Sequence, residues 1–148
     1  MFLRSSHAVY ECQYHVIWTV KYRKRALVNE YEREECKRVL RRAGKEYGME
    51  IDAVEVDVDH VHISIQIPPQ RSVGKAIGIL KSVSARKMFR RYPYLRQKFW
   101  AGALWSSGYF VRSMGEGVTA AMVRRYIESH TDEALGPAQA ELFPKGKV

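Results

Sequence analysis

The sequence predicts one α+β domain with the ferredoxin-like, split β-α-β plan. Its 148 residues, 46% hydrophobic and 28% charged, suit one globular domain with a substantial core. Segments with strand and helix periodicity follow one another in the order β-α-β-β-α-β, with a further helix at the end. The two middle strands are joined by very few residues and must therefore pair antiparallel. In this plan both long helices cover one face of an antiparallel sheet, and the other face stays open.

The first strand is expected within residues 7–20, after a short N-terminal arm at residues 1–6. Aromatic and β-branched residues are frequent in it, although their alternation is irregular. The strand leads into a basic cluster at residues 21–25 (KYRKR). Cations beside an aromatic ring suit phosphate contacts and base stacking, although a run of charges is more often a solvated face. The candidate DNA contacts here are Arg23, Lys24 and Arg25.

The next segment has the features of a structural helix followed by a second strand. Asn29 is a suitable N-cap, acidic residues fill the first turns, basic residues fill the last turns, and Gly48 ends the helix. In the strand at residues 49–58, Ile51 and Ala53 are out of phase with the valines that follow. This change of phase predicts a β-bulge.

Residues 59–67 (DHVHISIQI) alternate strictly between polar and apolar side chains. As a strand, they place His60 and His62 on one face and four β-branched residues on the other. At a rise of ~3.3 Å per residue the two histidines lie about 6–7 Å apart, so their rings can lean together and bind one cation. Taken alone, the spacing is more typical of a half-buried strand with a polar outer face. In the predicted fold, however, this is the face that the helices leave open.

A second long helix follows the hairpin. Ser72 can cap it, its apolar residues have helical spacing, and Tyr92-Pro93 ends it. Its polar surface is basic and supplies further candidate DNA contacts, although surface cations are common. These candidates are Lys81, Arg86 and Lys87.

The rest of the chain completes a single-domain scheme spanning residues 1–148. Residues 104–114 read as a fourth strand, or as a strand with a loop before it, and close a core at residues 7–114. A glycine-rich joint at residues 115–117 then leads to a helix at residues 118–131. A tail occupies residues 132–148.

Charge and cysteine content narrow the class of protein. The chain has 25 Lys and Arg against 16 Asp and Glu, a net charge of +9 and a pI near 9.7. This balance favours a polyanionic partner, most commonly nucleic acid, although a solubility charge or a small ribosome-like protein gives the same count.

Cys12 and Cys36 form no close ligand pair and suit a reducing compartment. With no long apolar run, we expect a cytoplasmic, nucleoid-associated protein without a membrane role.

The last helix carries a candidate nucleophile. Tyr126 and His130 are four residues apart, so the phenol and the imidazole lie one above the other. On the helix alone, Tyr126 reads more readily as a core aromatic and His130 as a complement to the helix dipole. Combined with the histidine strand, the pair suggests a phosphodiester chemistry. A divalent cation on His60 and His62, with His130 completing its shell, would act as a Lewis acid, and Tyr126 would attack phosphorus.

At this point the chain resembles the single-tyrosine HUH transposases of small bacterial and archaeal insertion sequences, the TnpA type. The resemblance covers nearly everything from His7 to His130. It rests on YHVIWTVKYRKR, DHVHISIQIPP, SVGKAIGILKSVSARKMF, FWAGALWSSGYFVRSMG and VRRYIESH. HVH alone is a weak motif, whereas HVH followed in this order by a distal tyrosine helix is specific.

The resemblance implies that His60 and His62 bind the metal, with Mg²⁺ or Mn²⁺ expected, and that Tyr126 is the nucleophile. No nucleotide cofactor is implied, because the covalent link conserves the energy of the cleaved bond. The family's third ligand is usually a glutamine four residues after the tyrosine, and His130 stands there in this chain. Histidine is a competent ligand, and its neutral nitrogen favours softer metals than an amide oxygen does.

The resemblance further implies cleavage of single-stranded DNA at the ends of the element. The products are a 5′-phosphotyrosine and a free 3′-OH, and subterminal hairpins are recognised. It also implies a homodimer in which the tyrosine helix of one subunit completes the histidine site of the other. Gly115 and Gly117 would then be the hinge.

Other classes of function fit parts of the sequence. A non-catalytic nucleic-acid-binding module also uses an open ferredoxin-like sheet with aromatics, but the central strands lack an RNP-like motif and the metal-suited histidines have no use there. A small metal hydrolase lacks an evident general base in the last helix. A relative that its host has retained to act on repeated palindromes carries the same motifs.

Overall fold

The structure is a computed structural model that describes residues 3–4, 9–99, 102–113 and 120–129. Its elements follow the order expected from the sequence, with three short additions: β1, η1 and α3. The bounds are β1 Leu3–Arg4, β2 Val9–Tyr10, β3 Gln13–Thr19, η1 Lys21–Arg23, α1 Glu30–Glu46, β4 Glu50–Val56, β5 His60–Gln66, α2 Val73–Arg91, α3 Pro93–Arg96, β6 Phe110–Ser113 and α4 Ala120–Ser129.

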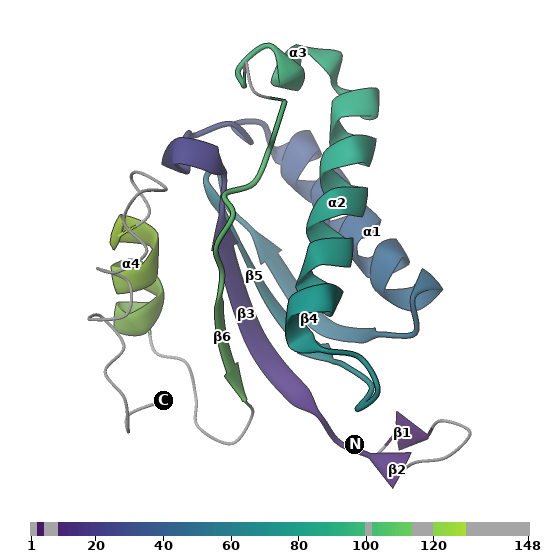
Figure 1. Ribbon diagram of the computed structural model, residues 1–148. Coiled ribbons are helices and arrows are strands. Elements are labelled where there is room, and N and C mark those ends of the chain that lie inside the picture. The colour runs from purple at the N-terminus through teal and green to yellow at the C-terminus, as the bar shows by residue number, and fades with distance from the viewer. Residues whose placement is uncertain (1–2, 5–8, 100–101, 114–119, 130–148) are drawn as a thin grey trace.

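Four strands form an antiparallel sheet with the order β4-β5-β3-β6. This order confirms the ferredoxin-like prediction, because the first and third strands of the pattern are the central pair. Figure 1 shows α1 and α2 on one side of the sheet and α4 on the other. The two long helices therefore cover only one face of the sheet. Part of the opposite face is covered by α4.

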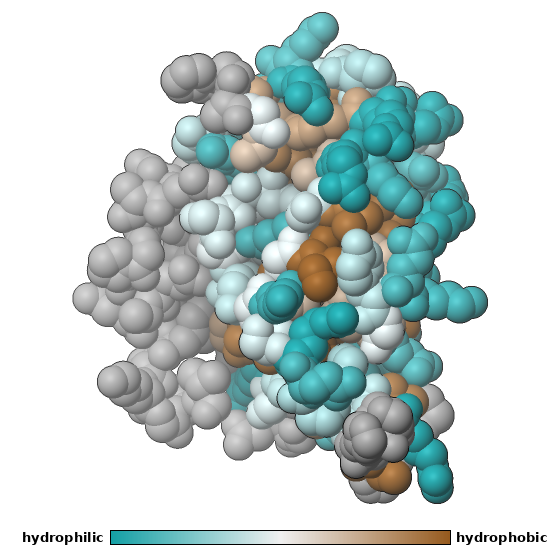
Figure 2. All heavy atoms as spheres, turned by 45° about the vertical axis from the view of Figure 1, so that its right-hand side comes forward, coloured by the Kyte–Doolittle hydropathy of each residue, from teal (hydrophilic) through white to brown (hydrophobic). Residues whose placement is uncertain are grey.

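The main core lies between the sheet and the two long helices. The sheet contributes alternate residues such as Val16, Trp18 and Ile63, and the helices contribute Leu40 and Leu80, all essentially buried. This alternation keeps the polar residues of β5 on the other face. Figure 2 shows that the outer side of the helix layer is mostly hydrophilic, with a smaller hydrophobic region at its centre.

The helix ends follow the predicted signals. The Asn29 N–H donates to Glu32 Oε1 at 3.0 Å, which joins the N-cap of α1 to its first turn. Gly48 follows α1 with a φ of +73°, a left-handed conformation that glycine adopts without strain. The hydroxyl of Ser72 accepts the N–H of Lys75 at 3.1 Å and caps α2 as expected.

The strand predictions hold in the hairpin and need correction at the N-terminus. The register of β4 against β5 shifts between Ile51 and Ala53, which confirms the predicted bulge. The expected first strand is interrupted, because Val9–Tyr10 pairs with Leu3–Arg4 in a separate two-stranded sheet while Gln13–Thr19 enters the main sheet. Part of the predicted arm is therefore a strand.

The fourth strand does not fill residues 104–114; it is a short strand with a loop before it, which was the second of the two predicted alternatives. It spans Phe110–Ser113 and is preceded by an irregular segment. Within the described residues, no helix is both long and apolar enough to cross a membrane.

Candidate active site

His60 and His62 lie side by side on the sheet face turned away from α1 and α2. Both are partly buried, whereas Val61 and Ile63 between and beyond them are fully buried in the main core. The register places Thr19 of β3 opposite His60, and Ile17 opposite His62. The structure thus confirms that the two imidazoles share a face, as the alternation in the sequence predicted.

A carboxylate holds the ring of His60. Nδ1 of His60 lies 2.9 Å from Oδ1 of Asp59, and the two side chains are 19% and 18% exposed. This hydrogen bond is the largest cause of the lowered pKa of Asp59, the charges of His60, Arg23 and Arg25 act in the same direction, and burial opposes them. A histidine whose Nδ1 is held in this way presents Nε2 to a metal ion.

The ring of His62 is suited to metal ligation in a different way. Its Nε2 is buried and has no hydrogen-bond partner among the described residues. Burial lowers the pKa of His62, and positive charge on His15 and His60 lowers it further. A neutral imidazole nitrogen is the form that binds metals, so the site fits a divalent cation.

His15 of β3 is a neighbour that the sequence interpretation did not single out. Its ring centroid lies 5.6 Å from that of His62. The strand register could have indicated it, because His15 pairs with Ser64, two residues beyond His62 on the same face. His15 acts on His62 through its charge, as the lowered pKa of His62 indicates.

Tyr126 of α4 lies against the same face of the sheet. Its side chain is fully buried in a small cluster with Ile17 and Phe110, and its ring centroid lies 5.9 Å from that of Phe110. Ile17 is also the residue paired with His62. Ile17 therefore belongs to the cluster of the candidate nucleophile and is also the strand partner of the candidate metal-binding histidine, within a single chain.

Arg23 connects the basic cluster to both parts of the site. Its Nη1 donates to the carbonyl of Ile127 in α4 at 3.4 Å, and its charge contributes to the lowered pKa of Asp59. Tyr22 and Arg23 have φ values of +59° and +52°, which non-glycine residues rarely adopt. This left-handed turn directs the predicted DNA contact toward α4.

The other predicted DNA contacts are in varied environments. Lys24 donates to the carbonyl of Lys98, whereas Arg25 and Arg86 are exposed and Lys87 is partly buried. Lys81 donates to the carbonyls of Ser106 and Gly108 at 2.8 and 2.7 Å, which makes it part of the fold. Their contact with DNA stays a prediction.

A complete metal shell is not present within the described part of the chain. No group of three or more His, Cys, Asp or Glu side chains there is placed to hold a metal ion. The predicted third ligand, His130, lies outside the described residues, as do Gly115 and Gly117 of the predicted hinge. The described structure supplies two imidazoles and the carboxylate that orients one of them.

Comparisons with known proteins agree on one family. The family model described as "Transposase IS200 like" matches residues 8–130. The ISDra2 transposase TnpA of Deinococcus radiodurans is 40% identical over 125 residues, covering 84% of this chain and 88% of that protein. The transposase of insertion sequence element IS200 from Salmonella typhimurium is 29% identical over 128 residues, covering 86% of this chain and 82% of that protein.

A solved structure gives the same result for the fold. The crystal structure of a candidate transposase from Deinococcus radiodurans superposes with a TM-score of 0.75 at 34% sequence identity. The match covers 88% of this chain and 98% of that chain.

Proposed function

This chain belongs to the IS200-like transposases, and from that premise we propose that it cleaves and rejoins single-stranded DNA at insertion-sequence ends through Tyr126. Transposition makes DNA its partner. The proposed reaction passes through a 5′-phosphotyrosine intermediate and depends on a divalent metal. The proposed substrate is recognised by its subterminal hairpins. The cytoplasmic, nucleoid-associated location remains a prediction.

The observation that carries the proposal is the arrangement around Ile17. Tyr126 packs on Ile17 from α4, and His62 is the strand partner of Ile17 on β5. A phenol and a pair of imidazoles thus lie on the same face of the sheet, although more than 60 residues separate them in the sequence. A tyrosine whose role is only to fill a core does not require two histidines on the same face of the sheet.

The proposed reaction is an exchange of phosphoester bonds. The phenol oxygen of Tyr126 attacks the phosphorus of the scissile linkage, a P–O bond to the tyrosine forms, and the bond to the 3′-oxygen breaks. The phenol loses its proton and the departing 3′-oxygen gains one, so no oxidant, reductant or nucleotide is consumed. Attack of a free 3′-OH on the phosphotyrosine reverses the step and rejoins strands.

The proposed metal is Mg²⁺ or Mn²⁺. His60 and His62 would hold it through the nitrogens described above, and His130 is the proposed third ligand. Bound there, a divalent ion supplies Lewis acidity toward the phosphate oxygens. Asp59 keeps the His60 ring in a fixed orientation, and the buried surroundings of His62 keep that ring neutral.

The proposed assembly is a homodimer that shares its active sites. In the single chain, α4 packs on its own β3 and β6 through Tyr126. In the proposed dimer the two subunits exchange this helix, which is a low-cost route to a dimer. A mixture of a His60→Ala protein with a Tyr126→Phe protein tests this, because an exchanged dimer restores one intact site while sites built within one chain remain inactive.

The central test is a covalent adduct. The protein is incubated with single-stranded end DNA and Mg²⁺ or Mn²⁺, and a denaturing gel is examined for protein joined to DNA. We expect an adduct with the wild-type protein, none with Tyr126→Phe and none with EDTA, while hairpin binding by Tyr126→Phe is retained. An adduct that persists in Tyr126→Phe would overturn the assignment of the nucleophile.

A further inference from the structure

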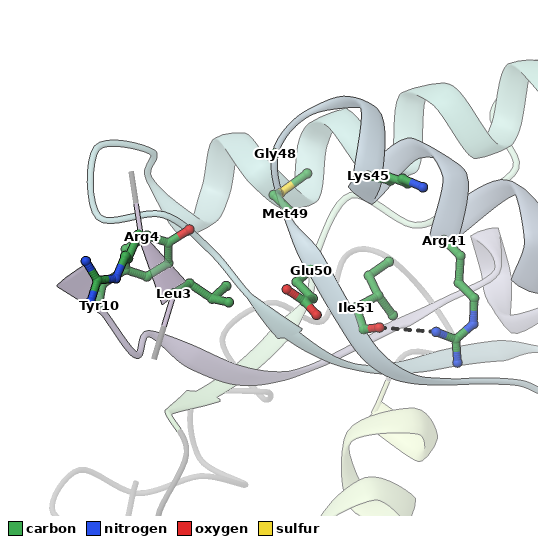
Figure 3. Close-up of a pocket in the computed structure, with 9 residues that line it drawn as sticks. All are labelled: Leu3, Arg4, Tyr10, Arg41, Lys45, Gly48, Met49, Glu50 and Ile51. Atoms are coloured by element: carbon green, nitrogen blue, oxygen red, sulfur yellow. Dashed lines mark hydrogen bonds between the residues drawn. The ribbon is translucent and has the colours of Figure 1, made fainter. Parts of the chain in front are cut away.

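A basic groove lies at the end of the sheet where β5 finishes. Two adjoining cavities of about 540 and 640 Å³ share Arg4, Tyr10 and Gly48 in their linings. Figure 3 shows the first of them, with β1 and β2 on one side, the start of β4 beneath, and the last turns of α1 on the other side. The second continues past Pro68 to the start of α2.

The charge of this groove is strongly one-sided. Its lining includes five cations and one carboxylate, Glu50. The cations come from four separate elements or turns, so they surround the space instead of following one exposed helix face. They are Arg4, Arg41, Lys45, Arg71 and Lys75.

Two of the arginines are held in place by backbone carbonyls. Nη1 of Arg41 donates to the carbonyl of Ile51 at 3.1 Å, and Nη1 of Arg71 donates to the carbonyl of Tyr47. A guanidinium has five N–H donors, so one such bond leaves others able to meet an anion. Held guanidiniums lose less entropy when they bind phosphate oxygens than mobile ones do.

The rest of the lining suits a nucleotide better than a bare anion. Tyr10 and Tyr47 contribute two partly exposed rings, and Leu3, Met49 and Ile51 supply an apolar lining. Aromatic rings between cations are the arrangement that nucleic-acid grooves use, with bases on the rings and phosphates on the cations. A small inorganic anion does not need the apolar part.

The groove is distinct from the candidate active site. It contains Glu50, which pairs with Gln66 at one end of the hairpin, whereas His60 is at the other end of β5. Six residues of strand separate the two ends, about 20 Å at ~3.3 Å per residue. This distance corresponds to roughly six base pairs of duplex at 3.4 Å each. The α1 and α2 residues of the lining lie on the helix side of the sheet, whereas the histidines face the other side. DNA that contacts both places therefore passes around the end of the sheet where β5 finishes.

We propose that this groove binds the phosphodiester backbone of the DNA substrate at a position away from the cleaved linkage. This inference rests on the proposed function, because it takes DNA as the substrate. It does not depend on how the DNA is cleaved. Its role is to hold the DNA while the phosphate to be cleaved lies near Tyr126.

The test compares two groove variants with a control that loses the same charge. The groove variants are Arg41→Gln with Lys45→Gln, and Arg71→Gln with Lys75→Gln. The control is Arg38→Gln with Arg42→Gln, which removes two exposed cations of α1 that do not line the groove. Fluorescence anisotropy gives Kd at several salt concentrations for a hairpin with a single-stranded tail and for an unpaired oligonucleotide of equal length. Thermal melting verifies that every variant is folded.

We expect each groove variant to bind at least one of the two DNA probes roughly tenfold more weakly than the control does. The slope of log K against log salt should fall by about 0.9 for each duplex phosphate that a variant no longer neutralises, and by about 0.7 for each phosphate of a single strand. Weaker binding of the hairpin alone identifies a duplex occupant, and weaker binding of the unpaired DNA alone identifies a single strand. Kd values and slopes equal to those of the control for both probes would overturn the proposal.

Adduct formation separates this proposal from the proposed function. At saturating DNA, the groove variants should form the phosphotyrosine adduct at the wild-type rate, because the lining of the groove includes neither the histidines of β5 nor Tyr126. If the wild-type protein forms no adduct, the proposed chemistry fails while the binding comparison can still be interpreted.

Discussion

Nδ1 of His60 lies 2.9 Å from Oδ1 of Asp59, the residue that precedes it in the chain. The turn that joins β4 to β5 therefore orients the first histidine of the strand as well as reversing the chain. Since Nδ1 is occupied, Nε2 is the nitrogen directed to a ligand. A carboxylate behind a ligating histidine fixes its ring and raises its basicity.

The first prediction follows from this contact. Asp59→Asn should weaken metal binding by about 10–100-fold, because an amide holds and polarises the imidazole less well than a carboxylate does. Isothermal titration with Mn²⁺ measures the affinity, and adduct formation at rising Mn²⁺ should show the same shift. Asp57→Asn is the matched control, since Asp57 is exposed in the same turn and its Oδ1 accepts the N–H of Val58. Equal Mn²⁺ affinity in the two variants would contradict the role of Asp59.

The second prediction concerns pH. The pKa of His62 is lowered from its ordinary 6.5, mainly by burial. The folded protein thus binds this proton less tightly than the unfolded chain does, and the ring stays neutral somewhat below pH 6.5. Metal binding through His62 should persist there and be lost as the pH falls through the lowered pKa. The stability of the metal-free protein should decline as the pH falls from about 6.5 to the lowered pKa of His62, because the unfolded chain takes up the proton first.

Histidine NMR titration of the metal-free protein checks this shift. The His62 resonances are assigned by their absence in a His62→Gln variant. A midpoint at or above 6.5 would show that the surroundings of His62 do not disfavour its charged form.

The third prediction concerns how α4 is held. Ile17 is fully buried in one cluster with Tyr126, so Ile17→Ala leaves a cavity in that cluster that costs about 2–5 kcal/mol, whereas Ile17→Val costs about 0.5–1.5 kcal/mol. Arg124 and Arg125 are exposed on α4 and are trypsin sites. Trypsin should cleave α4 faster in Ile17→Ala than in Ile17→Val or the wild type. Equal cleavage rates would show that the contact with Ile17 does not hold the helix.

Local patterns predicted the parts of the fold that depend on neighbours in the sequence. The alternation from His60 to Gln66 placed the histidines on the open face, and the change of phase at Ile51 and Ala53 placed the bulge. The interruption of the first strand was not predicted. It depends on pairing with Leu3–Arg4, for which two residues give too short a pattern to detect.

Side-chain contacts with distant chain segments were not predicted either, while the DNA contacts themselves stay predictions. Arg23 was predicted to contact DNA from its place in a charge run, but its bond to Ile127 spans 104 residues. Lys81 has the spacing of a surface residue on α2, yet its ammonium reaches the loop before β6. A long flexible side chain can meet partners that the periodicity of its own helix does not reveal.

The fourth prediction separates a structural cation from an exposed one on the same helix. The ammonium of Lys81 donates to the carbonyls of Ser106 and Gly108 and lies over the rings of Trp18 and Tyr109 at 5.9 and 5.8 Å. Lys81→Met removes both hydrogen bonds and leaves the two carbonyls to find other partners. The expected decrease in the free energy of unfolding is about 2 kcal/mol, or roughly 4–8 °C in Tm.

Arg86→Met is the matched control, because Arg86 is exposed and its replacement removes the same charge from α2. Its stability should stay within about 0.5 kcal/mol of the wild type. Differential scanning calorimetry of both variants measures the difference, and DNA affinity is determined on the same samples. If Lys81→Met and Arg86→Met have the same Tm, the two carbonyl contacts do not stabilise the fold. Lys81 would then be a candidate DNA contact without a structural role.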